Sequence, residues 1–314
     1  MSDNFVVGGG VAGLVFCYLN KDFLLIDSRP LGQLNSTYIL GPRYLQKNDE
    51  VEKFILNNEK DLDLRNAEVV TSNIGFKSNE KVNSNFNQEF IDKYNKTSRS
   101  TNKDEGSFMS GHKTSIDYFT FSPYNAGESY LKLFRSIYRK LVNEERVIFG
   151  EVEKIDLEKK MLYCNSQNNY SSSYDKLILT IHLKIMKKVI KNSILDDFDF
   201  KLEEKNFYVT SYDSCNLKLS KKYCYIYSVE DEYTRKTFQG AYIVYEAKSS
   251  IESDFIDNNK IFKRFENLPI QISQSLDLNN LNNDVFLLGR YAQWKHSIRF
   301  DTLFKEIDRI QKEI

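Results

Sequence analysis

The stretch Phe5-Val6-Val7-Gly8-Gly9-Gly10-Val11-Ala12-Gly13-Leu14, near the start of the 314-residue chain, decides the fold. Its apolar start predicts a strand, its glycines predict a turn, and the apolar residues that follow to Leu19 predict a helix. The helix is unusually short, with Asn20-Lys21-Asp22 as a compressed turn, and a second apolar run, Phe23-Leu24-Leu25-Ile26, ends on Asp27. Strand, glycine turn, helix, strand and carboxylate is the order of a nucleotide-binding βαβ unit.

Each glycine of the turn has an expected task. Gly8 permits a sharp turn, Gly10 lets a pyrophosphate approach the backbone, and Gly13 lets the helix pack closely against the strand. A helix N-terminus carries about +0.5 elementary charge and unpaired N–H groups, both of which favour a phosphate. Asp27 is then placed to accept hydrogen bonds from both hydroxyls of a ribose. The alternative is a glycine turn beside an ordinary buried helix.

Composition excludes several classes of function. Lys plus Arg and Asp plus Glu both number 44, so no global field favours nucleic acid or an anionic membrane, although a local basic patch stays open. The four cysteines show no CxxC spacing, and His112 and His182 show no metal-ligand spacing, so we expect no metal and read both histidines as structural. We find no secretory signal and no apolar run of spanning length, which predicts a soluble cytoplasmic protein.

The rest of the chain alternates helix and strand patterns. The segment from Ser28 to Gln33 joins a basic residue to a glycine turn, which we expect to wrap a nucleotide. Residues 77–104 are polar and predict a loop or insertion, and residues 165–173 predict a polar turn. Helices are expected at about 48–56, 128–143, 257–265 (weakly) and 299–314. Strands are expected at 67–70, 74–76, 147–149, 152–156, 161–164, 176–180, 207–209, 223–229, 241–245 and 285–288.

These elements predict an α/β fold, with a Rossmann-like (βαβ) domain into which a mixed α+β substrate domain is inserted. The nucleotide-binding domain is expected to be discontinuous and to comprise residues 1–65, 145–185 and 285–314. The substrate domain then comprises residues 66–144 and 186–284.

With these pieces in order, the chain resembles the FAD-binding superfamily of UDP-galactopyranose mutases and flavin amine oxidases. Beyond the N-terminal unit, Leu40-Gly41-Pro42-Arg43-Tyr44 is similar to the mutases' Gly-Pro-His-aromatic segment near the flavin ring. Tyr233-Thr234-Arg235 resembles their Tyr-Thr-Arg segment, whose arginine faces the active-site cleft. Leu288-Gly289-Arg290-Tyr291 resembles the C-terminal Gly-Arg segment that returns to the flavin. The chain departs from the mutases where Arg43 replaces a histidine, and where Trp294 and His296 replace tyrosines that hold a diphosphate sugar.

The resemblance implies FAD as the cofactor. Val152 matches the position where a strand backbone holds the adenine, and Arg290 the position near the pyrophosphate or ribityl chain. The implied cofactor-binding residues are Gly8, Gly10, Val11, Ala12, Gly13, Asp27, Ser28, Gln33, Val152, Gly289 and Arg290. The candidate catalytic residues are Arg43, Arg235, Trp294 and His296.

Each assignment has an ordinary structural alternative. Val152 can be a core valine, and Arg290 can be a surface arginine at a strand end. Arg43 can be a solvated loop residue, and Arg235 can form an ion pair within a strand. Trp294 can be a packing aromatic, and His296, which as a catalyst would be a general acid or base, can be structural.

The resemblance implies an FAD-dependent oxidoreductase, amine-oxidase-like, in which a small-molecule substrate is oxidised by hydride transfer to flavin N5. One alternative is a UDP-galactopyranose-mutase-like, redox-neutral reaction on a nucleotide sugar. The other alternative is a flavin-binding protein without turnover. No nucleic-acid or membrane partner is expected, and a homodimer is left open.

Overall fold

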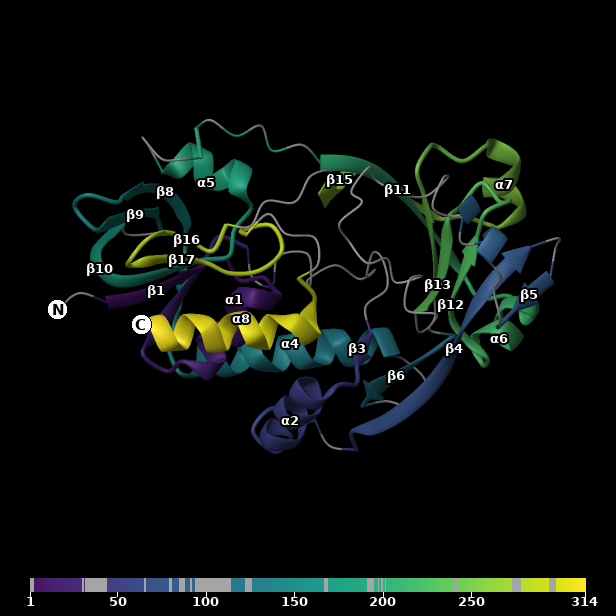
Figure 1. Ribbon diagram of the computed structural model, residues 1–314, viewed down its shortest axis with the longest axis horizontal. Coiled ribbons are helices and arrows are strands. Elements are labelled where there is room, and N and C mark those ends of the chain that lie inside the picture. Colours follow the sequence, from purple (N-terminus) through teal and green to yellow (C-terminus); the bar gives the residue numbers. More distant parts are fainter. Residues whose placement is uncertain are drawn as a thin grey trace.

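The structure is a computed structural model of the chain. It describes residues 3–29, 31, 44–64, 66–78, 81–84, 88–90, 92–93, 114–121, 126–166, 169–190, 195–196, 198, 200, 202–239, 242–272, 278–293 and 298–314. Two sheets lie side by side, and helices cover their faces (Figure 1).

The first sheet has a parallel centre formed by the predicted βαβ unit. Strand β1 (Asp3–Val7) pairs in parallel with both β2 (Phe23–Asp27) and β10 (Tyr170–Leu179). The sheet continues to β7 (Val147–Phe149) beside β2, and to β17 (Val285–Leu287) and β16 (Asn280–Asn282) beyond β10. Two further strands, β8 (Glu151–Asp156) and β9 (Met161–Asn165), form an antiparallel ladder with the first part of β10. The carboxyl ends of β1, β2, β10 and β17 therefore share one edge of the sheet.

Both faces of the parallel strands are buried, as their continuous apolar runs predict. On one face, Val6, Leu25 and Ile178 pack with residues of α1 (Val11–Leu19), α4 (Ala126–Asn143) and α8 (Phe300–Glu313). On the other face, residues such as Phe5 and Leu177 pack with α5 (Leu183–Val189) and the β8–β9 ladder. Figure 1 shows α4 and α8 running along the sheet, with α2 (Asp49–Asn58) beyond them. The sheet is thus the middle layer of three.

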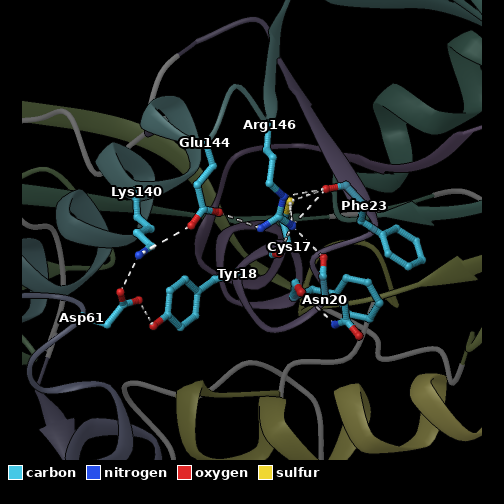
Figure 2. Close-up of polar contacts among 9 residues, drawn as sticks. Cys17, Tyr18, Asn20, Phe23, Asp61, Lys140, Glu144 and Arg146 are labelled. Atoms are coloured by element: carbon cyan, nitrogen blue, oxygen red, sulfur yellow. Dashed lines mark hydrogen bonds and ion pairs between the residues drawn. The ribbon is translucent and has the colours of Figure 1, made fainter.

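A buried arginine holds the end of the short helix α1 (Figure 2). Arg146, which lies between α4 and β7 and is 8% exposed, donates to the carbonyl oxygens of Cys17, Asn20 and Phe23. Its other terminal nitrogen lies 3.2 Å from Glu144 Oε2. The last carbonyl groups of a helix lack intrahelical partners and carry partial negative charge. A guanidinium stabilises them both by donating hydrogen bonds and by its positive charge. Arg146 therefore explains how the compressed turn after α1 is tolerated.

The second sheet is mixed and contains all the other strands of the described residues. Its order is β15 (Lys263–Ile272), β11 (Leu202–Ser211), β14 (Tyr242–Ala247), β13 (Arg235–Gln239), β12 (Tyr223–Ser228), β4 (Glu68–Ser78), β6 (Ser115–Thr120) and β3 (Leu45–Gln46), with β5 (Lys81–Asn83) on β4. Two short helices, α6 (Ser214–Ser220) and α7 (Ser253–Asn258), cover one face. Figure 1 shows these helices on the side of the sheet away from the first sheet.

Most expected elements are present, and four expectations differ. The loop or insertion expected at 77–104 is wrong at Lys77 and Ser78, which end β4, and at Lys81–Asn83, which form β5 beside β4. The polar turn expected at 165–173 is wrong from Tyr170 onward, because Tyr170 to Ser173 pair with β9 and begin β10. The weak helix expected at 257–265 is wrong: α7 ends at Asn258 and β15 begins at Lys263, where pairing with β11 decides the backbone conformation. The two strands expected at 67–70 and 74–76 are one strand, β4.

The chain passes between the two sheets more often than the expected domain boundaries imply. Leu45–Gln46, within the segment 1–65, pairs with β6 of the second sheet. Helix α4, within the segment 66–144, packs on α1 in the core of the first sheet and also contacts β6 and β13 of the second. Among the described residues, no helix is both long and apolar enough to cross a membrane.

Candidate functional site: a glycine cradle at the edge of the first sheet

The glycine turn between β1 and α1 has the geometry of a phosphate cradle. Gly8 has a φ of +109°, which only glycine adopts readily. A Cβ on Gly13 would overlap the carbonyl oxygen of Gly8, so the helix can approach the turn only because that atom is absent. A Cβ on Gly10, by contrast, would meet none of the described residues within 4 Å. Gly10 also begins α1 as its N-cap without a side-chain hydrogen bond, so open space faces an uncapped helix N-terminus.

Asp27 lies at the end of β2 with its carboxylate against Gly9, where a Cβ would overlap it. Its Oδ1 accepts the backbone N–H of Arg29 at 3.1 Å. Its Oδ2 is buried and has no hydrogen-bond partner among the described residues. Burial raises the pKa of Asp27 above its ordinary value, and the backbone and guanidinium of Arg29, with the backbone of Gly9 and Ser28, oppose this only in part. A buried acceptor without a donor fits the hydroxyl groups of a ribose.

Thr180, directly after β10, completes the turn and was not singled out from the sequence. Its Oγ1 lies 2.8 Å from the carbonyl oxygen of Gly8 and 3.0 Å from that of Val7. The hydroxyl therefore keeps the Gly8 carbonyl turned toward β10 and Gly13, away from the open space at Gly10. A carbonyl oxygen turned into that space would repel an anion. In the sequence, the only indication of this role for Thr180 was that a hydroxyl residue lies at the end of an expected strand.

The C-terminal segment meets the glycine cradle, although about 280 residues separate them in sequence. Gly289 has a φ of +94°, and a Cβ there would come to 2.8 Å from the Cβ of Ala12. The backbone N–H of Leu288 donates to the carbonyl oxygen of Leu179 at 3.0 Å, which fixes this segment at the same edge of the sheet. Arg290 is partly exposed and donates from Nε to the carbonyl oxygen of Ile298 at 3.2 Å. The N-terminal glycine turn and the Gly289 segment therefore line one cradle, which suits a ligand as long as a dinucleotide.

Val152 and Ser28 lie next to this cradle on the side of Asp27. The backbone N–H of Gly150 donates to the carbonyl oxygen of Asp27 at 3.1 Å, so β8 begins where β2 ends. Val152 pairs with Cys164, and its side chain is 8% exposed, as a core valine would be. Ser28 is exposed immediately after Asp27. The role expected for the Val152 backbone stays a prediction.

Arg235 lies in the second sheet and has buried ionic partners. Glu246, on the neighbouring strand β14, is 5% exposed and forms ion pairs with both Arg235 and Lys205. The Arg235 guanidinium carbon lies 5.9 Å from the centre of the Tyr227 ring. The neighbour Lys236 points to the opposite face, where it contacts Asn216 of α6, so Arg235 lies on the face without α6 and α7. The ion pair expected as the structural alternative is therefore present.

The Glu246 ion pairs predict an acid-sensitive fold. Burial alone raises the pKa of Glu246, but the charges and hydrogen bonds of Arg235 and Lys205 outweigh it and lower the pKa to about 2, from an ordinary 4.5. The resulting stabilisation is complete above pH 4.5 and disappears as pH falls toward 2. We expect Glu246→Gln to lower the free energy of unfolding by ~3 kcal/mol at pH 7. Urea unfolding from pH 7 to pH 3 measures this; a constant difference between the two proteins across that range would contradict it.

His182 is structural, as expected. Its Nδ1 accepts the backbone N–H of Lys184 at 3.0 Å and so caps α5, and its ring stacks on Tyr291 at 5.4 Å. Burial, then the charge of Lys184, lowers its pKa to about 4. The predictions made for Gln33, Arg43, Trp294, His296 and His112 lie outside the described residues.

No protein-family model matches the sequence, and no curated protein sequence matches it. Solved structures match it over nearly its whole length. Reduced UDP-galactopyranose mutase gives a TM-score of 0.62 at 12% identity, covering 100% of this chain and 96% of the other. A putrescine oxidase double mutant from a redesign of cofactor binding gives 0.62 at 7% identity, covering 99% and 98%. The PF1083 protein from Pyrococcus furiosus gives 0.62 at 10% identity, covering 99% and 97%.

The TM-scores and the coverage establish a shared fold, and sequence identities this low leave the activity open. The match includes both sheets of this chain, since nearly all of it is covered. The chain therefore has the fold of UDP-galactopyranose mutase and putrescine oxidase, the two kinds of enzyme that its sequence resembles.

Proposed function

We propose that this protein is an FAD-dependent oxidoreductase that oxidises a small molecule. The observation that carries the proposal is the cradle itself. An uncapped helix N-terminus, a buried carboxylate oxygen with no donor among the described residues, and the C-terminal Gly289 turn converge at one sheet edge. These groups match a pyrophosphate, a ribose and the second half of a long dinucleotide in that order.

The residues of the cradle would hold FAD as follows. The backbone of Gly10, Val11 and Ala12 would receive the pyrophosphate, and Asp27 would accept the ribose hydroxyl groups. Gly289 and Arg290 would close over the part of the cofactor that continues from the pyrophosphate. When bound, the flavin supplies the capacity to accept a hydride from substrate, and the protein supplies binding, orientation and charge.

The second sheet is proposed as the substrate side. The face that carries Arg235 and Glu246 has no cover from α6 or α7, and α4 joins this sheet to the first. Tyr44, Tyr225 and Tyr227 are buried on the same face, and the Tyr44 hydroxyl donates to the carbonyl oxygen of Cys224 at 2.6 Å. We propose that Arg235, with Arg43, Trp294 and His296 of the sequence resemblance, contacts the substrate there.

Asp27→Asn tests the cradle through two opposite effects. Because burial raises its pKa, folded Asp27 binds a proton more readily than in the unfolded chain, so its ionised form destabilises the apoprotein near neutral pH. The neutral amide should therefore raise the melting temperature of the apoprotein. Loss of the charged acceptor should weaken FAD binding by about tenfold or more. Thermal melts and FAD titrations measure the two effects.

A matched control is Asp156→Asn, the partly buried last residue of β8, whose carboxylate accepts the backbone N–H of Lys159 at 3.1 Å; this variant should leave FAD affinity unchanged. In the parent, FAD affinity should also fall as pH is lowered through the raised pKa of Asp27. A loss of melting temperature in Asp27→Asn with no change in FAD affinity would show that the carboxylate is structural.

A substrate screen tests the reaction. The purified flavoprotein is mixed anaerobically with amines and alcohols, and the visible flavin absorbance is followed. Bleaching without added reductant supports an oxidoreductase. Bleaching with none of them, in a protein that holds FAD, would count against it.

One observation favours a second candidate, a redox-neutral reaction on a nucleotide sugar. The cluster of Arg235, Lys205 and Glu246 contains two cations and one anion, and such a surplus suits an anionic diphosphate better than a cationic amine. Turnover of a nucleotide sugar only after reduction with dithionite would support this reaction. A flavoprotein that shows neither activity would support binding without turnover.

A further inference from the structure

Gln293 is a fully buried polar side chain for which the proposed reaction gives no role. It has 0% exposure and lies four residues after Gly289. Its Oε1 accepts the backbone N–H of Gly289 at 3.1 Å. Its Nε2 donates to Asn279 Oδ1 at 3.2 Å and to Glu306 Oε2 at 3.0 Å. One amide thus joins the Gly289 turn, the residue preceding β16 and helix α8.

These contacts satisfy both backbone polar groups of Gly289. With a φ of +94°, Gly289 directs its N–H into the protein, where a buried donor without a partner is costly. The backbone N–H of Gln293 also donates to the carbonyl oxygen of Gly289 at 3.0 Å, so the side chain and main chain of one residue clamp both polar groups of the glycine.

The clamped turn is a wall of the cradle. A Cβ on Gly289 would lie only 2.8 Å from the Cβ of Ala12, in the first turn of α1, so there is little space between the turn and the helix. A small shift of Gly289 would therefore change the distance between α1 and Arg290, the two groups proposed to hold opposite parts of the cofactor.

We propose that Gln293 is a positioning residue for FAD, which sets the distance between the Gly289–Arg290 turn and the N-terminus of α1. The inference rests on the proposed FAD site. Gln293 acts through Gly289 and makes no contact with the cofactor itself. Binding sites hold their ligands tightly when a second layer of hydrogen bonds fixes the groups that touch the ligand.

The test is the FAD affinity of Gln293→Met, which keeps the volume of the side chain and removes both its donor and its acceptor. Apoprotein is titrated with FAD, and the dissociation constant is read from the change in flavin fluorescence. We expect affinity to fall by about tenfold or more. Val209→Ala, a buried substitution in the second sheet, is the control: it should lower the melting temperature while leaving FAD affinity within about twofold.

Exchanging the two residues of the Gln293–Glu306 pair separates a positioning role of Gln293 from its packing. It also tests the proposal if Gln293→Met does not fold. Gln293→Glu alone places two carboxylates together and should weaken FAD binding. The double variant Gln293→Glu/Glu306→Gln again provides an acceptor for Gly289 and a donor from α8, and should bring FAD affinity back to within about threefold of the parent.

The outcomes are distinguishable. A parent protein that binds no FAD refutes the proposed function. A parent that binds FAD, together with a folded Gln293→Met that binds it equally well, overturns only the role of Gln293. A folded double variant that stays as weak as Gln293→Glu also overturns it.

Discussion

Gly10→Ala should leave the apoprotein as stable as the parent and weaken FAD binding by at least about tenfold. The backbone at Gly10 has a φ of −76°, which alanine adopts without strain, and within 4 Å the added Cβ would meet no atom of the part of the chain that the structure describes. In the apoprotein the change is therefore neutral. In the complex, the same methyl group would occupy the space that the pyrophosphate needs. FAD titration and thermal melts of the apoprotein measure the two effects.

Gly13→Ala is the matched comparison, one turn along the same helix. Its Cβ would overlap the carbonyl oxygen of Gly8, so α1 has to move away from the turn and the apoprotein should lose ~3 kcal/mol of unfolding free energy. Gly10→Ala thus tests the space left for a ligand, and Gly13→Ala tests the packing of α1 against the turn. If Gly10→Ala binds FAD like the parent, the pyrophosphate does not lie at this turn.

Arg146→Met should destabilise the protein by ~3 kcal/mol, because it removes the guanidinium that serves the carbonyl groups of Cys17, Asn20 and Phe23. Methionine retains much of the apolar stem, so the loss reports mainly the missing donors. Urea unfolding measured by circular dichroism checks the size of the effect. FAD affinity should change little if the protein is folded, since Arg146 binds the end of α1 far from Gly10.

Glu144→Gln is the control for this arginine. It removes the carboxylate charge that pairs with both Arg146 and Lys140, on a side chain that is 34% exposed, so it should cost no more than about 1 kcal/mol. Equal losses in the two variants would mean that the Glu144 ion pair, and not the cap on α1, gives Arg146 its importance.

The centre of the fold was predictable because its signal is local. The strand, glycine turn, helix and strand from Asp3 to Asp27 follow one another without interruption, and a Cβ would clash at Gly8, Gly9 and Gly13. The meeting of Gly289 with Ala12 was not local, and only the resemblance to a known superfamily predicted it.

The contacts that hold the site could not be predicted in the same way. Thr180 and Gln293 are ordinary residues in sequence, and their importance comes from partners such as Gly8 and Glu306 that only the folded chain brings near. The same is true of Arg146 and Glu246, whose burial depends on elements far away along the chain. For β15, pairing with β11 overrode a weak helical pattern.

Binding of FAD by the glycine cradle together with the Gly289 turn can be measured by calorimetric titration of the purified apoprotein with FAD and, separately, with NAD. We expect saturation at equimolar FAD, and binding of NAD at least about tenfold weaker, because the flavin half of FAD is what the C-terminal turn is proposed to contact. An apoprotein that binds no FAD, or that binds NAD as tightly as FAD, would show that the cradle and the turn do not hold FAD together.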